Sequence, residues 1–74
     1  MKIQFKKVVT LEVVTNMVGD TPVTEDVTWQ MGEKEEIDIC DDKNPPDASE
    51  IQFGCGDVAF VTPSFWEAVS ILAE

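Results

Sequence analysis

Apolar and polar residues alternate over the first fourteen positions, which is the pattern of a β-strand with one covered face. The apolar residues of this segment share odd positions and are Ile3, Phe5, Val9, Leu11 and Val13. Many of the residues are β-branched, which also favours a strand. Lys7 interrupts the apolar side and indicates a bulge or a bend at that point. We therefore predict one long first strand that bends in its middle.

Turn-forming residues divide the rest of the chain into shorter alternating runs. The segment 16–22 contains asparagine, glycine, aspartate and proline, and it predicts a turn or a short loop. The expected strands after it share alternation or β-branched character, and they span 23–31, 37–39, 51–53 and 58–61. A hairpin turn with glycines on both sides of Cys55 is expected between the last two.

Near the C-terminus the apolar residues no longer recur at every second position but at the three- to four-residue spacing of a helix. The residues that fit one helical stripe are Phe65, Trp66, Val69, Leu72 and Ala73. Thr62 followed by Pro63 suits a helix start, and Ser64 with Glu67 matches a capping box. We predict a short C-terminal helix over about residues 63–73 that packs on the fold.

These elements predict a mainly β protein with one domain over residues 1–74. The expected architecture is a small SH3-like barrel or a strongly bent antiparallel sheet of about five strands, closed by the C-terminal helix. The run EIQFGCGDVAFVTPSFW (50–66) resembles the last hairpin of an SH3-like barrel entering its final turn. In size, acidity and lack of catalytic residues, the chain resembles small accessory proteins encoded by bacteriophages.

The charge of the chain is strongly negative. Fifteen acidic residues face five lysines, with no histidine, and the formal net charge is −10. Such a protein is repelled by phosphate backbones and by anionic membranes, so we expect no binding to nucleic acids or membranes. Its field favours basic partners. The same charge also serves solubility alone, and the sequence does not separate the two explanations.

Catalytic and metal-binding constellations are missing from the sequence. Without histidine, neither a Ser–His nor a Cys–His pair can form within the chain, and we expect no enzymatic activity. Two cysteines cannot complete a four-ligand zinc site, and the acidic loop around residues 41–50 lacks EF-hand spacing. We therefore expect no cofactor and no metal.

Localisation is inferred from hydropathy and cysteine usage. No apolar stretch approaches the ~20 residues that cross a bilayer, and the N-terminus lacks the features of a signal peptide. We expect a cytoplasmic protein whose two cysteines stay reduced. Cys40 is expected to fill a small gap near the end of the third strand, and Cys55 to be an unreactive thiol at a hairpin tip.

The aromatic residues are expected in the core, with one exception. Phe60 and the other aromatic side chains fit inward faces of their strands or helix. Trp66 directly follows Phe65 and cannot point the same way, so it either closes the core or lies on a contact surface. The candidate interaction surface combines this tryptophan with the densest acidic segment: Glu33, Glu35, Glu36, Asp38, Asp41, Asp42, Asp47 and Trp66.

Three functional hypotheses remain from the sequence. The first is a non-enzymatic interaction module that binds a protein partner through its acidic surface or a strand edge. The second is a self-assembling structural or accessory protein, since a small sheet leaves unpaired edges and the first strand carries Val8 and Val14 on its second face. The third is a DNA mimic, whose carboxylates imitate phosphates. A homo-oligomer is expected, and a stable, concentration-independent oligomer would favour the second hypothesis over the first.

Overall fold

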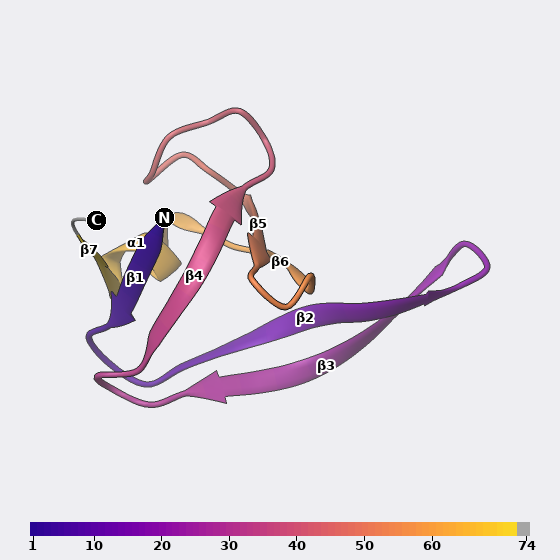
Figure 1. Ribbon diagram of the computed structural model, residues 1–74, viewed down its shortest axis with the longest axis horizontal. Helices are drawn as coiled ribbons and strands as arrows, with labels where there is room; N and C mark the ends of the chain where they lie inside the picture. Colours follow the sequence, from indigo (N-terminus) through magenta and orange to yellow (C-terminus); the bar gives the residue numbers. More distant parts are fainter. Residues whose placement is uncertain (73–74) are drawn as a thin grey trace.

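The computed structural model describes residues 1–72 and shows an open antiparallel sheet with one short helix (Figure 1). In chain order the elements are β1 (Lys2–Phe5), β2 (Val9–Val18), β3 (Thr21–Trp29), β4 (Lys34–Ile39), β5 (Glu50–Phe53), β6 (Val58–Phe60), α1 (Pro63–Glu67) and β7 (Val69–Leu72). No helix among the described residues is long and apolar enough to cross a membrane.

The strands lie in the order β3-β2-β6-β5-β4-β1-β7, and every neighbouring pair is antiparallel. The predicted mainly β, antiparallel fold with a short helix is confirmed. The prediction of about five strands is wrong, because the sheet has seven within residues 1–72. The sheet is also not closed into a barrel, since β3 and β7 each have one sheet neighbour and do not pair with each other.

The predicted long first strand is divided into two strands at the expected bend. Residues 6–8 leave the sheet between β1 and β2, so that β1 lies between β4 and β7 while β2 lies between β3 and β6. The predicted turn over 16–22 is much tighter than expected. β2 continues to Val18 and β3 begins at Thr21, so the turn consists of Gly19 and Asp20 alone. Gly19 adopts a φ of 61° there.

The predicted helix over 63–73 is correct only in its first turn. The helix ends at Glu67, the amide of Ala68 bonds to the carbonyl of Phe65, and the chain then continues as β7. Val69 and Ile71 alternate along β7 and pair with Phe5 and with Ile3 of β1. Pairing with the open edge of β1 therefore makes this segment a strand, although the spacing of its apolar residues favours a helix. Ala73, the last residue of the expected stripe, lies outside the described residues.

The core contains a chain of aromatic rings. Trp29 stacks on Phe5 and on Phe53, with 5.2 Å between ring centroids in each case. Phe65 meets the edge of Phe5 at 6.2 Å and of Trp66 at 5.1 Å. Because β1 and β3 lie far apart in the strand order, these stacks show that the sheet curls around its core.

The structure decides the placement of two aromatic residues, and one of them contradicts the sequence-based assignment. Trp66 is buried, and its indole Nε1 donates a hydrogen bond of 2.8 Å to the carbonyl oxygen of Ala48. It therefore closes the core and is removed from the candidate interaction surface. Phe60, expected in the core, is 66% exposed. In the three-residue β6, Ala59 points inward between Val13 and Ile51, so its neighbour Phe60 points outward.

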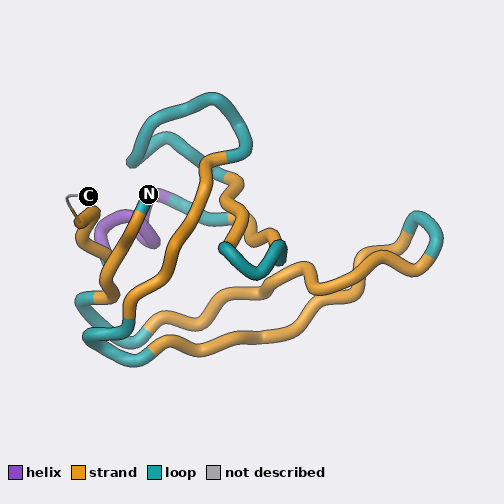
Figure 2. The backbone as a smooth tube through the Cα atoms, in the orientation of Figure 1, coloured by secondary structure: helices purple, strands orange, loops and turns teal. Residues whose placement is uncertain are grey.

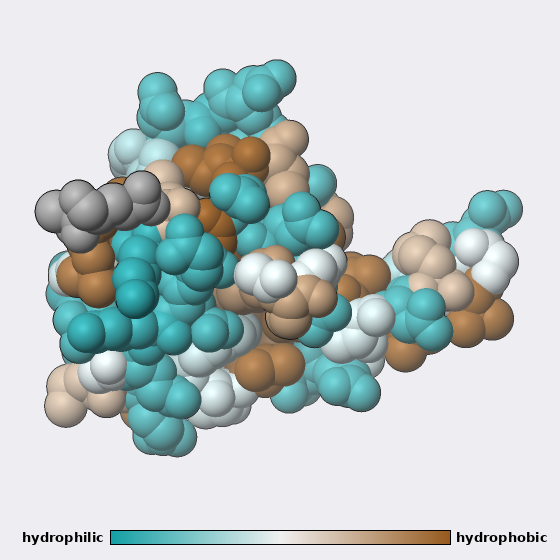
Figure 3. Space-filling model, viewed as in Figure 1, coloured by the Kyte–Doolittle hydropathy of each residue, from teal (hydrophilic) through white to brown (hydrophobic). Residues whose placement is uncertain are grey.

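The β2–β3 hairpin extends well beyond the rest of the sheet. β6 pairs with β2 only at Val13 and Val14, so residues 15–23 form a two-stranded ribbon, here called the arm. Figure 2 shows the arm projecting to the right of the body. In Figure 3 hydrophilic residues cover most of the visible body, whereas hydrophobic patches recur along the arm. The longest dimension of the molecule is 37 Å.

Candidate outer-face interaction site

The strand register defines the face of the sheet that points away from the core, here called the outer face. One row of directly paired residues crosses five strands on this face and consists of Thr24, Val14, Val58, Gln52 and Asp38. The alternate residues, such as Val13 and Ile51, point into the core and are buried. The outer face is therefore the uncovered side of the sheet.

Apolar side chains form a continuous strip on this outer face. The apolar strip consists of Phe60, Val58, Val14 and Met17. Val14 and Val58 are half-buried by each other, whereas Phe60 and Met17 are largely exposed. A bulge at residue 15 restores Met17 to the same face as Val14, because two residues of β2 then oppose one of β3. The strip thus runs from β6 onto the arm.

A shallow groove lies at one end of the apolar strip, where the arm leaves the body. Its volume is about 330 Å³, and its lining includes Val14, Met17 and Val58 together with Gly56 from the β5–β6 turn. Gly56 has a φ of 100° and no side chain, so the groove stays shallow on the side of the β5–β6 turn. The groove offers an apolar side chain of a partner a place beside the strip.

Carboxylates flank the apolar strip on both sides. On one side Glu12 of β2 lies directly opposite Asp26 of β3. On the other side Glu50 of β5 pairs with Phe60, and Asp38 of β4 follows one strand further away. Like charges placed directly opposite each other destabilise a sheet, so the Glu12–Asp26 pair weakens the unbound protein. A cation bound between them removes this repulsion.

The structure does not gather the eight predicted surface residues into one site. Glu36 and Asp38 lie on the outer face of β4, and Glu36 pairs with the N-terminal ammonium group at 3.1 Å. Glu35 points to the inner face and accepts a 3.3 Å hydrogen bond from the Trp29 indole. Glu33 accepts a hydrogen bond from the backbone amide of Gln30 and so braces the β3–β4 turn.

The other predicted acids belong to the β4–β5 loop. Asp42 and Asp47 are exposed there, while Asp41 accepts hydrogen bonds from the backbone amide of Ser49 at 2.7 Å and from its hydroxyl at 2.8 Å. These bonds from Ser49, opposed by a smaller desolvation effect, lower the pKa of Asp41 below its ordinary value. Asp41 therefore holds its own loop in place.

Sequence reasoning missed the residues that do converge on the outer face. Phe60 was assigned to the core, Glu12 and Asp26 were not singled out, and Glu50 was considered only as an oxygen ligand of the acidic loop. The order of strands carries the missing information, because it places β6 between β2 and β5 and so brings Phe60 beside Glu50. Alternation along each strand was the only available signal, and it fixes which residues share a face without showing which strands are neighbours.

Both cysteines are exposed free thiols. The expectation that Cys40 fills a small gap near the end of its strand is therefore wrong, because its side chain is exposed. Partial desolvation, followed by the carboxylate of Glu50, raises the pKa of the Cys40 thiol. Cys55 lies in the β5–β6 turn.

Among residues 1–72, no three side chains of the metal-ligating kinds lie close enough to hold one metal ion. No protein-family model, no curated protein and no solved structure matches the chain.

Proposed function

We propose that the protein is a non-enzymatic interaction module that binds a basic, partly apolar segment of another protein on its outer face. Phe60 is the observation that carries this proposal, because a two-thirds exposed aromatic ring lies at the centre of a face bordered by carboxylates. Exposed aromatic residues contribute strongly at protein interfaces, where a ring fills an apolar pocket of the partner.

The arrangement of the outer face defines the partner's chemistry. The apolar strip from Phe60 to Met17 takes apolar side chains, and the carboxylates on its two sides take lysine or arginine. A partner cation placed at Glu12 and Asp26 relieves their repulsion and so contributes to binding. The carboxylates also accelerate the approach of a basic partner, and this effect weakens with added salt.

A synthetic peptide of alternating lysine and leucine is a suitable probe, with alternating glutamate and leucine as its control. We expect the basic peptide to shift amide resonances of β2, β6 and β5, and the acidic peptide to shift none. Phe60→Ala should weaken binding by about tenfold or more. Ile71→Ala removes another exposed apolar side chain, on β7, and should leave affinity unchanged. Equal losses from the two variants, or peptide shifts confined to other surfaces, would contradict the proposal.

The carboxylates of the outer face also support a second candidate, a DNA mimic. Acids from four strands lie on this one face, namely Asp26, Glu12, Glu50, Asp38 and Glu36. A mimic of phosphates depends on these charges and not on the ring of Phe60. The two candidates therefore differ in one measurement. Phe60→Ala weakens partner binding by about tenfold or more in the first case and leaves it unchanged in the second, where only replacement of the carboxylates by amides weakens binding.

A further inference from the structure

The arm carries the inner face of the β2–β3 hairpin beyond the core. Val13 on this face is 2% exposed, whereas Val23 and Val18, further along the same face, are 38% and 64% exposed. Beyond Val14 the hairpin has no third strand among the described residues. An isolated two-stranded ribbon is only marginally stable in water, and burial of its apolar side chains stabilises it. The inner face of the arm is thus an uncovered apolar surface.

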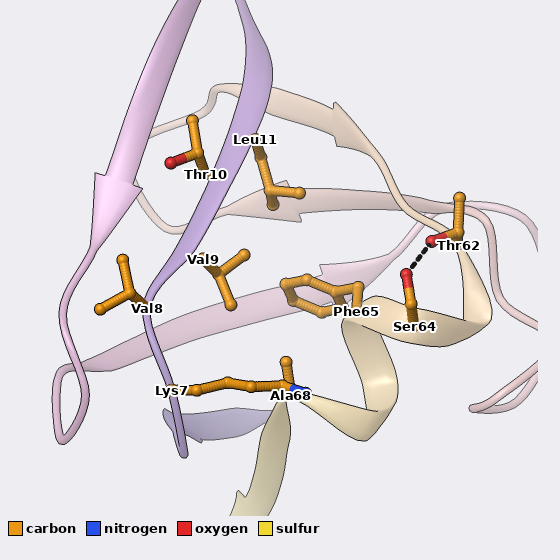
Figure 4. Close-up of a pocket in the computed structure, with 9 residues that line it drawn as sticks. All are labelled: Lys7, Val8, Val9, Thr10, Leu11, Thr62, Ser64, Phe65 and Ala68. Carbon is orange, nitrogen blue, oxygen red and sulfur yellow. Dashed lines mark hydrogen bonds between the residues drawn. The ribbon is translucent and has the colours of Figure 1, made fainter.

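A groove of about 350 Å³ lies at the other end of the same hairpin, between the start of β2 and α1 (Figure 4). Val9 and Leu11 of β2 form one wall, and the ring of Phe65 is turned toward Val9. Thr62 and Ser64 lie on the opposite wall and share a hydrogen bond of 2.7 Å. The groove therefore has an apolar floor that suits aliphatic side chains.

The arm tip and the groove carry opposite charges. Asp20 in the arm's turn is the only charged residue between positions 13 and 24. Lys7 lines the groove, and Lys6 precedes it in the exposed bend before β2. Two copies of a chain with a net charge of −10 repel each other over most of their surfaces. Contact between the tip of one copy and the groove of another places a carboxylate beside lysines.

We propose that two copies form a two-fold dimer in which the arm tip of each lies in the groove of the other. Val18 and Val23 enter the groove beside Phe65, and Asp20 pairs with Lys7. Tip and groove lie at opposite ends of one hairpin, so two hairpins arranged antiparallel make both contacts at once and the assembly closes. The dimer uses the inner face and goes beyond the proposed function, which concerns the outer face.

Sedimentation equilibrium of the full chain from micromolar to millimolar concentration tests the assembly. We expect the mass to rise from the 8.2 kDa of one chain to twice this value and to stop there. A mass of one chain at the highest concentration would overturn the proposal. A mass that continues to rise beyond the dimer would overturn it as well, because an open chain of copies has no closed two-fold contact.

Charge reversal then tests which surfaces meet. Lys7→Glu and Asp20→Lys should each weaken the dimer by about tenfold or more, because each contact occurs twice. In a mixture of these two variants, every acidic groove meets a basic tip and every basic groove meets an acidic tip. The mixture should therefore form a heterodimer with affinity close to that of the unaltered chain. A mixture that stays as single chains rules out the tip-to-groove contact.

Matched variants control for net charge and for the other surface. Lys2→Glu and Asp26→Lys make the same charge changes on the outer face and should leave the dimer within about threefold of its original affinity. If Lys2→Glu weakened the dimer as much as Lys7→Glu, net charge alone would govern assembly, and Asp20→Lys would then strengthen the dimer because it makes the chain less negative. Phe60→Ala should leave the dimer intact, so failure of the dimer and failure of peptide binding on the outer face are distinguishable.

Discussion

The indole Nε1 of Trp66 donates a buried hydrogen bond of 2.8 Å to the carbonyl oxygen of Ala48. This bond joins α1 to the β4–β5 loop, and Ala48 itself is buried. A loop with several acidic residues and two prolines is thereby attached to the core at one point. The tryptophan that the sequence offered as a contact residue instead holds the longest loop of the described chain in place.

Trp66→Phe should destabilise the protein by about 1–3 kcal/mol, because it leaves the Ala48 carbonyl buried without its donor. Urea denaturation measures the change, and Phe60→Leu is the control because Phe60 is exposed. The control should change the free energy of unfolding by less than about 0.5 kcal/mol. Equal unfolding midpoints for the two variants would contradict the structural role of the indole bond.

The C-terminal strand β7 should be essential for folding. Ending the chain after Ala68 removes Val69, which is buried, and leaves the edge of β1 unpaired. We expect an unfolded or aggregated chain, observed as loss of a cooperative thermal transition. A cooperative transition at an unchanged temperature would show that β7 is dispensable.

The loss of stability caused by single substitutions in β7 should increase with the burial of the replaced side chain. Val69→Ala removes enclosed methyl groups and should cost about 1.5–3 kcal/mol. Leu72→Ala should cost less than about 2 kcal/mol, because Leu72 is only half-buried. Thermal or chemical denaturation of both variants checks the order, and a larger loss from Leu72→Ala would contradict it.

Local pattern predicted much of the sheet but not its connections. Alternation located the central strands near their observed positions, and Lys7 correctly marked the bend. The prediction of a helix over the C-terminal segment was wrong. Val69 and Leu72 fit a helical stripe, but Val69 and Ile71 fit the alternation of a strand equally well. The open edge of β1, far away in sequence, decides between them, and no local rule contains that information.

The candidate site was less predictable than the fold, for a related reason. All four residues of the run Val58–Val61 are apolar, so either the even-numbered or the odd-numbered ones could face the core. Alternation therefore could not show that Phe60 points outward. Its neighbours come from strands distant in sequence, such as Glu12 from β2. Net charge correctly indicated an acidic surface but not which carboxylates share a face.

The Asp41–Ser49 contact should make stability depend on acid pH. The folded state lowers the Asp41 pKa, so the unfolded chain binds the proton more tightly and the contact stabilises the ionised form. This contribution is complete above the ordinary aspartate pKa of about 3.9 and disappears as the pH falls through the lower folded value. Unaltered chain and Asp41→Asn should therefore differ in unfolding free energy at neutral pH and converge near pH 2. A difference that is the same at both pH values would contradict this assignment.

Glu50 should suppress the reactivity of Cys40. Desolvation and the nearby carboxylate of Glu50 raise the thiol pKa, so less thiolate is present at a given pH, and only the thiolate reacts with alkylating reagents. With Cys55→Ser as background, Cys40 is the only thiol, and Glu50→Gln should increase its alkylation rate at about pH 8 by roughly two- to tenfold.

Glu67→Gln removes an equally negative, exposed carboxylate from α1 and should leave the Cys40 alkylation rate unchanged. Desolvation is the larger cause of the raised pKa, so Glu50→Gln should restore only part of the reactivity of a free thiol in water. The pH profile of alkylation separates the two effects, because removal of Glu50 moves its midpoint to lower pH without reaching that of a small thiol. If Glu50→Gln and Glu67→Gln shift the midpoint equally, the general negative field controls Cys40 and the specific contact with Glu50 does not.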